Sequence, residues 1–261
     1  VNTLVVCDRG TYIRWIKTNP INEIISKQKS FTYFHTRVLN REILDRAKQA
    51  KKSLEIDLSI DKNGKPYIGH PLSFYEFMNI QAPNNLELDI VLNEMKSANI
   101  FLVLDIKSKK LISLATEIIK NFGAEKCLLH SYTSELEFKP YSSDLVIEPH
   151  WINEHIALES IMEIKYSTGV PLALSCRGID KQYFDTHNED DVIDKIVEVV
   201  NGNIEAIALN LHTDDILPVN ILNSLLENSI IPLINIDKTL NAKFPPLYLG
   251  ASDHLSKASN T

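Results

Sequence analysis

The stretch Phe101-Leu-Val-Leu-Asp105 decides the fold of this 261-residue chain. Its four consecutive apolar residues lack the apolar/polar alternation of a strand that has one face in water. Such a run is typical of a strand covered on both faces, as in a parallel sheet packed between helices. The stretch therefore predicts an α/β protein with a carboxylate near the end of a buried strand.

Similar short apolar runs recur along the chain, at residues 31–35, 54–60, 100–106, 127–132, 145–151, 171–176, 206–211, 231–236 and 247–251. Helical patterns lie between most of them, at 41–51, 86–97, 111–122, 156–166, 190–200 and 219–228. This alternation predicts right-handed βαβ units and, at this length, a single-domain (β/α)8 TIM barrel. Nine candidate strands for eight positions mean that one is misread or lies outside the barrel. A doubly wound open sheet is the alternative, but no glycine-rich phosphate loop follows an early strand.

The domain prediction divides the chain at residue 30. Residues 1–30 are expected to form an N-terminal extension packed on the barrel, and residues 31–261 the barrel domain. Within the extension, Val1–Cys7 is β-like, while 12–17 and 21–27 have helical patterns. The extension is expected either to cover the bottom of the barrel or to brace its first strand.

The composition of the chain limits which classes of binding partner and which cellular compartments are expected. A formal net charge of −7 argues against nucleic-acid binding, but a small phosphorylated substrate remains compatible with it. Three widely spaced cysteines argue against a disulfide framework and favour a reducing compartment. No apolar run approaches the roughly 18 residues of a membrane span, and charges interrupt the N-terminal apolar stretch. The expected localisation is cytoplasmic, or secreted or periplasmic if an upstream signal was removed.

Polar residues follow the first three confident strands, at the edge where a barrel carries its chemistry. Glu55 and Asp57 are two residues apart on one strand and share a face, and Asp105 and Lys107 repeat this spacing on the next. The three carboxylates repel one another unless a cation neutralises them, and an all-oxygen set suits one Mg2+ or Ca2+ ion. The preceding strand ends in His35, which is followed by Arg37.

A tight turn follows, because Asp61-Lys-Asn-Gly-Lys65 contains an Asn-Gly pair. The turn is expected to return the chain so that His70 lies near Glu55 and Asp57. Two histidines beside an acidic metal site suit phosphodiester cleavage, since one accepts a proton from the attacking hydroxyl and the other donates one to the leaving oxygen. His35 and His70 are therefore the predicted catalytic residues.

The stretch Glu55-Ile-Asp-Leu-Ser-Ile-Asp-Lys-Asn-Gly-Lys-Pro-Tyr-Ile-Gly-His70 resembles the signature of the glycerophosphodiester phosphodiesterase family, within the phospholipase-C-like phosphodiesterase superfamily. Leu102-Val-Leu-Asp-Ile-Lys107 resembles the family's E-I-K strand. The resemblance implies a phosphodiesterase TIM-barrel domain, a divalent cation on Glu55, Asp57 and Asp105, and a glycerophosphodiester or lysophospholipid-like substrate cleaved through a cyclic phosphate.

Two departures are similar to the sphingomyelinase D/phospholipase D branch of that superfamily. The first strand ends His35-Thr-Arg37 where the family has His-Arg-Gly, and Asp105 stands where the family has Glu. In that branch an internal hydroxyl attacks the phosphorus and the cyclic phosphate is released. A lyase of this type is therefore the alternative to a hydrolase.

Further candidates are expected to contact the substrate or to lie at the ends of strands. Lys107, Arg37 and Trp151 are the expected substrate contacts, and His130 is a further strand-end candidate. Cys176 has no histidine nearby in the sequence that would mark it as a nucleophile. Two other functions remain open: a catalytically inactive barrel that binds a ligand or partner, and a metal-independent barrel hydrolase with a carboxylate pair.

Overall fold

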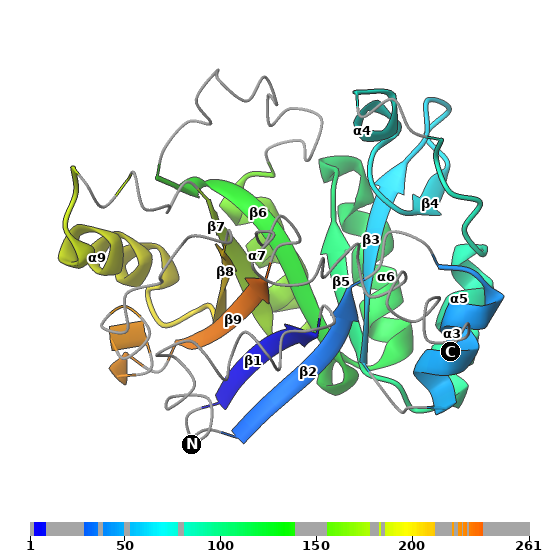
Figure 1. The fold of residues 1–261 in the computed structure, drawn as a ribbon, viewed down its shortest axis with the longest axis horizontal. Helices are drawn as coiled ribbons and strands as arrows, with labels where there is room; N and C mark the ends of the chain where they lie inside the picture. The colour runs from blue at the N-terminus through cyan, green and yellow to red at the C-terminus, as the bar shows by residue number, and fades with distance from the viewer. Residues whose placement is uncertain are drawn as a thin grey trace, which may run out of the picture.

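The computed structural model describes residues 3–8, 29–35, 39–49, 53–77, 81–138, 156–177, 183, 186–211, 221, 224–225, 227–228 and 230–236. They form a mixed α/β structure around one sheet (Figure 1). The strands are β1 (Thr3–Asp8), β2 (Lys29–His35), β3 (Ser53–Ile60), β4 (Pro66–Ile68), β5 (Leu102–Ile106), β6 (Cys127–Glu137), β7 (Leu172–Arg177), β8 (Ala206–Leu211) and β9 (Ile231–Ile236). The helices are α3 (Arg41–Gln49), α4 (Leu72–Phe77), α5 (Leu88–Ser97), α6 (Ile112–Phe122), α7 (Leu158–Thr168) and α9 (Glu189–Val200), with short 3-10 turns at Lys109–Leu111 and Ala124–Lys126.

The strand order is β2-β1-β9-β8-β7-β6-β5-β3-β4, and β2 also pairs with β3. All of these pairs are parallel except β3 with β4. Parallel neighbours need a crossover between them, and helices lie between successive parallel strands from β2 to β8. The predicted alternation of strands and helices is therefore confirmed for the described residues.

The candidate strands that fall on described residues all belong to this sheet, whereas 145–151 and 247–251 lie outside the described residues. The β-like segment at the N-terminus is also a strand. β1 pairs with β2 on one side and with β9 on the other, so this part of the predicted extension is integral to the sheet and does not cover it. The division of the chain at residue 30 otherwise stays a prediction.

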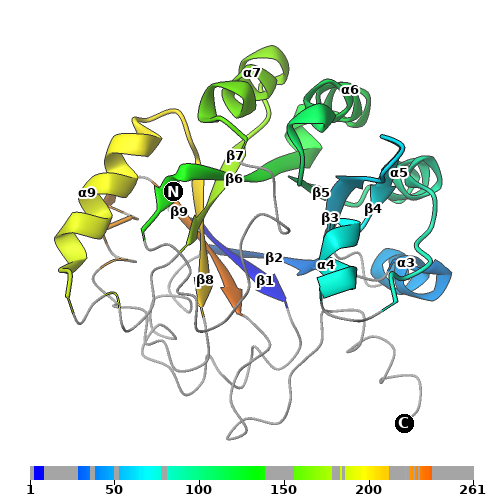
Figure 2. The ribbon, with the colours of Figure 1, turned by 90° about the horizontal axis from the view of Figure 1, so that it is seen from above.

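The helices α3, α5, α6, α7 and α9 lie along the outer side of the strands, as the view from above shows (Figure 2). Their apolar faces pack on one face of the sheet: Val91 and Met95 of α5 and Ile119 of α6 are buried in one cluster with Ile56 and Leu104 of the strands. The burial of this apolar face stabilises the fold, at about 25 cal/mol per Å² of apolar surface removed from water.

The other face of β3 and β5 is buried as well, but it carries polar residues. Every residue from Ser53 to Ser59 is buried, and so is every residue of β5. Because side chains alternate along a strand, the leucines and isoleucines of β3 and β5 face the helices and the carboxylates face inward. This alternation gives the sheet one apolar outer face and one inner face able to hold charged groups.

The chain between β3 and β4 forms the predicted hairpin. The backbone of Asp61 donates to Lys65 O at 2.9 Å, and its carboxylate accepts the backbone N–H groups of Asn63 and Lys65, each at 2.8 Å. Gly64 has φ +81°, the left-handed conformation that a tight turn requires here. The hairpin turns the chain back so that β4 runs antiparallel to β3 and leads directly to His70.

Among the described residues, no helix combines the length and the apolar character that a membrane crossing requires.

Candidate metal and acid-base site

Register brings the inward-facing polar residues of three adjacent strands level with one another. Asp57 of β3 lies opposite Asp105 of β5, and Asp105 lies opposite His130 of β6. The strands are parallel, so residues near their carboxyl ends gather at one edge of the sheet. Glu55, two residues before Asp57, shares its face. The sequence-predicted carboxylates therefore lie together, and a histidine from the next strand joins them.

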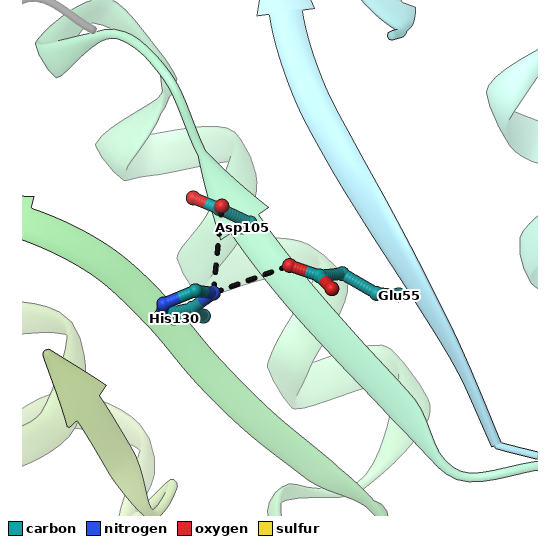
Figure 3. A group of neighbouring side chains, drawn as sticks. All are labelled: Glu55, Asp105 and His130. Carbon is teal, nitrogen blue, oxygen red and sulfur yellow. Dashed lines mark hydrogen bonds and ion pairs between the residues drawn. The ribbon is translucent and has the colours of Figure 1, made fainter. Parts of the chain in front are cut away.

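Glu55, Asp105 and His130 form the innermost group, and each is more than nine-tenths buried. His130 Nδ1 lies 3.2 Å from Glu55 Oε1 and 3.4 Å from Asp105 Oδ2. Figure 3 shows the three side chains pointing toward one another from three separate strands. One ligand atom from each lies within 4.8 Å of the others, a spacing at which the three can share one metal ion.

Lys107 places a cation beside this group. Its Nζ lies 2.5 Å from Asp105 Oδ2 and 3.1 Å from Asp57 Oδ1, and the side chain is 6% exposed. The backbone N–H of Lys107 donates to Leu58 O at 3.0 Å, which holds the start of the β5 loop against β3. Lys107 is thus a buried cation that bridges two of the predicted metal ligands.

Burial and the mutual charges shift the pKa values within the site. Burial is the largest effect on Asp105 and raises the pKa of its carboxyl, although Lys107 and His130 oppose this. Burial acts to lower the pKa of Lys107 and of His130, but the surrounding carboxylates outweigh it and raise both pKa values. Lys107 therefore remains an ammonium, and His130 favours its protonated form beside the carboxylates.

His70 lies at the rim of the group, as the hairpin predicts. Its Nε2 is 3.4 Å from Asp57 Oδ2, and the residue is 7% exposed. The phenol of Tyr67 donates to the backbone carbonyl of His70 at 2.5 Å, and the His70 N–H donates to Tyr75 Oη at 3.3 Å. Two tyrosines thus fix the backbone on which the predicted catalytic histidine stands.

The segment before His70 is anchored to β3 and to the loop before α5. Gly69 donates to Asp57 O at 2.8 Å, and its own carbonyl accepts the Ser59 hydroxyl at 2.6 Å. Asn85 donates to Ile68 O at 2.7 Å. Gly69 has φ +134°, a conformation that side-chain-bearing residues rarely adopt. These bonds determine where His70 enters the site.

The remaining predicted residues are described only in part or not at all. His35 is the last residue of β2 and lies opposite Glu55 in register, while its side chain is outside the described part. Arg37 and Trp151 lie outside the described residues. His130 was only a secondary candidate, because the sequence does not reveal that it lies opposite Asp105. Ser175, whose Oγ is 2.8 Å from His130 Nε2, carries no sequence signal at all.

Cys127 and Cys176 take no part in this group. Cys127 and Cys176 are buried, free thiols among the described residues. Burial raises the pKa of the Cys127 thiol to about 12, and it raises the pKa of Cys176 as well. Neither thiol therefore has the lowered pKa that a nucleophilic cysteine requires.

No protein-family model matches the chain, and no curated protein matches its sequence. Solved structures give distant likenesses. A glycerophosphodiester phosphodiesterase from Parabacteroides distasonis superposes with a TM-score of 0.44 at 12% identity, over 92% of this chain and 87% of its own. A phosphonopyruvate hydrolase, in complex with oxalate and Mg2+, gives 0.40 at 9% identity, over 90% and 82%. A protein from Galdieria sulphuraria, provisionally assigned as a glycerophosphodiester phosphodiesterase, gives 0.36 at 11% identity, over 86% and 96%.

These scores carry no argument about activity. The functional proposal therefore rests on the residues of the site.

Proposed function

We propose that this protein is a divalent-cation-dependent phosphodiesterase that cleaves a glycerophosphodiester or lysophospholipid-like substrate. The observation that carries the proposal is the junction at Asp57, where a histidine and a buried ammonium meet one carboxylate. His70 Nε2 lies 3.4 Å from Asp57 Oδ2 and Lys107 Nζ lies 3.1 Å from Asp57 Oδ1. An acid-base group and a cation that faces phosphoryl charge thus adjoin a group able to hold a metal.

The charges of the group support a divalent cation. Glu55, Asp57 and Asp105 carry three formal negative charges, and Lys107 offsets one of them. When a metal ion takes the place of the proton on His130, two negative charges remain in a buried space, and one divalent ion neutralises them. The Asp105 Oδ1 atom accepts no hydrogen bond from the described residues, so it is available as a ligand. The residues present therefore fit a divalent ion.

Glu55 and Asp105 are the common ligands in this proposal, and Asp57 and His130 compete for the third position. When bound, the ion binds a phosphoryl oxygen and polarises the phosphorus toward attack. Lys107 neutralises charge on the phosphoryl oxygens, and Arg37 is a further cation for the same purpose. Trp151 lines the substrate pocket in this proposal.

The two predicted histidines perform the proton transfers. His35, at the end of β2, removes the proton from the attacking hydroxyl of the substrate, and His70 donates a proton to the leaving oxygen. If the two roles are reversed, substitution of either histidine is expected to have the same effect on turnover. Asp57 holds His70 in place and stabilises its protonated form by charge. Water opens the resulting cyclic phosphate in a hydrolase, whereas a lyase releases it.

We also propose that the sheet closes into a (β/α)8 barrel. The pairing of β2 with β3 supports closure, because β2 otherwise stands at one end of the strand order. β4 then lies outside the barrel as the return strand of the β3 hairpin. In such a barrel the inward-facing carboxylates lie at the end where active sites form.

The experiment is turnover of glycerophosphocholine and of lysophosphatidylcholine, followed by 31P NMR with Mg2+, Ca2+, Mn2+ or Co2+ and with EDTA. Turnover is expected only with a cation, and EDTA is expected to abolish it. His70→Ala should lower kcat by roughly 10²- to 10⁴-fold, the usual contribution of an acid-base group. His187→Ala, which removes an exposed histidine, is the matched control and should retain full activity.

The same spectra distinguish the products. A phosphomonoester as the final product indicates a hydrolase, and a persistent cyclic phosphate indicates the lyase. EDTA-insensitive turnover would contradict the proposal and favour a metal-independent barrel hydrolase. A folded wild-type protein without turnover on either substrate class under any of the cations would favour the inactive barrel.

A further inference from the structure

His130 links two features of the inner face that the proposed reaction leaves unexplained. One ring nitrogen, Nδ1, points at Glu55 and Asp105, and the other, Nε2, lies 2.8 Å from the hydroxyl of Ser175 on β7. All four residues are at least 94% buried. Glu55, Asp105, His130 and Ser175 thus form a buried chain of polar side chains that crosses four strands.

The contact with Ser175 determines which ring nitrogen of His130 is available to bind a metal ion. A neutral imidazole carries one N–H and one lone pair, and the partner of one nitrogen decides the state of the other. If Nε2 donates to Ser175 Oγ, the lone pair is on Nδ1 and points between the two carboxylates. Histidines that bind metals typically donate their second N–H to a protein acceptor in this way.

The distances around Nδ1 match a coordination sphere. Two ligand atoms that bind one ion at about 2.0–2.2 Å lie roughly 3 to 3.5 Å apart. His130 Nδ1 lies 3.2 Å from Glu55 Oε1 and 3.4 Å from Asp105 Oδ2, within that interval. An ion among these atoms thus replaces a proton on Nδ1 without a large movement of the side chains.

Asp57 is the rival third ligand, and its oxygens have other partners. Its Oδ1 lies 3.1 Å from Lys107 Nζ and its Oδ2 lies 3.4 Å from His70 Nε2. Each Asp57 oxygen thus lies beside a cation or a histidine, whereas Lys107 and His130 both approach Oδ2 of Asp105 and leave its Oδ1 without a hydrogen bond from the described residues.

We propose that the metal centre has one nitrogen and two oxygen ligands, from His130, Glu55 and Asp105, and that Ser175 is the residue that positions His130 for binding. This inference rests on the proposed function for its metal and replaces the all-oxygen set. An imidazole ligand shifts the preference toward borderline transition ions such as Zn2+, Fe2+ or Co2+ and away from Mg2+ and Ca2+.

The test uses one equivalent of Co2+ as the probe, observed by paramagnetic proton NMR. An imidazole that binds Co2+ through Nδ1 keeps its Nε2–H, which gives a strongly shifted resonance that disappears in D2O. The wild-type protein is expected to show one such resonance. His130→Ala should lose it, whereas His187→Ala should retain it. Persistence in His130→Ala, or absence in the wild type, overturns the proposal.

Ser175 is tested with a matched pair, because Thr and Val have nearly the same shape and differ in the hydroxyl. Ser175→Thr should bind Co2+ about 10- to 100-fold more tightly than Ser175→Val, the usual effect of a residue that orients a metal ligand. In Ser175→Val the Nε2–H should also exchange faster with solvent. Equal affinities and equal exchange rates in the two variants overturn the role of Ser175.

The two proposals fail separately. Cation-dependent turnover with no response of Co2+ binding to His130→Ala rejects the nitrogen ligand and leaves the phosphodiesterase intact. The expected Co2+ resonance without phosphodiester turnover supports the metal centre and rejects the phosphodiesterase.

Discussion

Lys107 has its ammonium between Asp57 and Asp105, and its removal leaves two buried carboxylates without a cation. Lys107→Met is therefore expected to lower the free energy of unfolding by about 3–5 kcal/mol, the usual cost of breaking a buried pair. Added Co2+ should reduce the difference from wild type, because the ion neutralises the same carboxylates. Urea denaturation with EDTA and with Co2+ measures both values.

Lys109→Met is the control for that experiment, since Lys109 is exposed two residues further along the chain. It should unfold as the wild type does under both conditions. A Lys107→Met protein as stable as the wild type in EDTA would show that the carboxylates are not ionised together in the folded state.

The ionisation of Tyr67 makes the free energy of unfolding depend on pH in the alkaline range. Burial is the main reason that the pKa of Tyr67 rises to about 12. The phenol in an unfolded chain titrates near pH 10. The folded state thus holds this proton more tightly, so the associated stability is complete below about pH 10 and is lost between about pH 10 and 12.

Tyr67→Phe lacks this proton and the bond to the His70 carbonyl. The difference in unfolding free energy between wild type and Tyr67→Phe should therefore shrink as the pH rises from 9 toward 11. Urea denaturation across that range measures it. A difference that stays constant over the whole range would contradict the assignment of the raised pKa to Tyr67.

At the scale of the element, the β3–β4 hairpin determines the position of His70. A Cβ on Gly69 would lie 3.1 Å from Tyr75 Oη and 3.2 Å from Asn85 Nδ2, in addition to the strain of φ +134°. Gly69→Ala is expected to destabilise the fold by about 1–3 kcal/mol, as a side chain in a strained conformation does. It should also reduce turnover, because the next residue is His70.

Gly64→Ala is the control that introduces backbone strain without a steric clash beside His70. Gly64 also has a positive φ, but a Cβ there meets nothing within 4 Å. The expected loss of stability is about 1 kcal/mol with turnover retained. Equal loss of turnover in both variants would show that the conformation of the hairpin turn determines the position of His70, and not the close contacts of Gly69 with Tyr75 and Asn85.

The sequence predicts elements where one signal dominates. The apolar run of β5, the Asn-Gly turn and the spacing of Glu55 and Asp57 each have one physical interpretation, and the strands, the hairpin and the carboxylate group are present as expected. The sequence pattern places the segment of β1 in an extension, because a short apolar run does not reveal which strands it will join. Its two partners, β2 and β9, come from distant parts of the chain.

The site was predictable only in part for the same reason. Residues two apart on one strand share a face, so the carboxylates could be grouped from the sequence. The meeting of Asp105 with His130, and of His130 with Ser175, depends on the register between strands. Register is set by the packing of the whole sheet and is invisible to a motif.

At the scale of the molecule, the two described cysteines report how firmly the layers are packed. Cys127 and Cys176 are buried in the core cluster, and burial raises both pKa values. In a Cys7→Ser background, their reaction with a disulfide reagent at pH 8 should require opening of the sheet. Labelling is thus expected to be slow in buffer and complete in 6 M urea, as measured by absorbance.

Rapid labelling of the native protein would contradict a close-packed interface between the sheet and the helices. The Cys127→Ala and Cys176→Ala variants identify which thiol reacts first. Since Cys127 begins β6 and Cys176 lies near the end of β7, the order of reaction shows which edge of the sheet opens more readily.

In the proposed function, the inward-facing carboxylates bind a metal ion for phosphodiester cleavage. The most direct measurement is the anomalous difference density of a Co2+-soaked crystal, collected at the cobalt absorption edge. One strong peak is expected, bounded by Glu55 and Asp105, with His130 Nδ1 as the nitrogen ligand. A protein with cation-dependent turnover whose crystals show no peak between Glu55 and Asp105, or only a peak elsewhere, would contradict it.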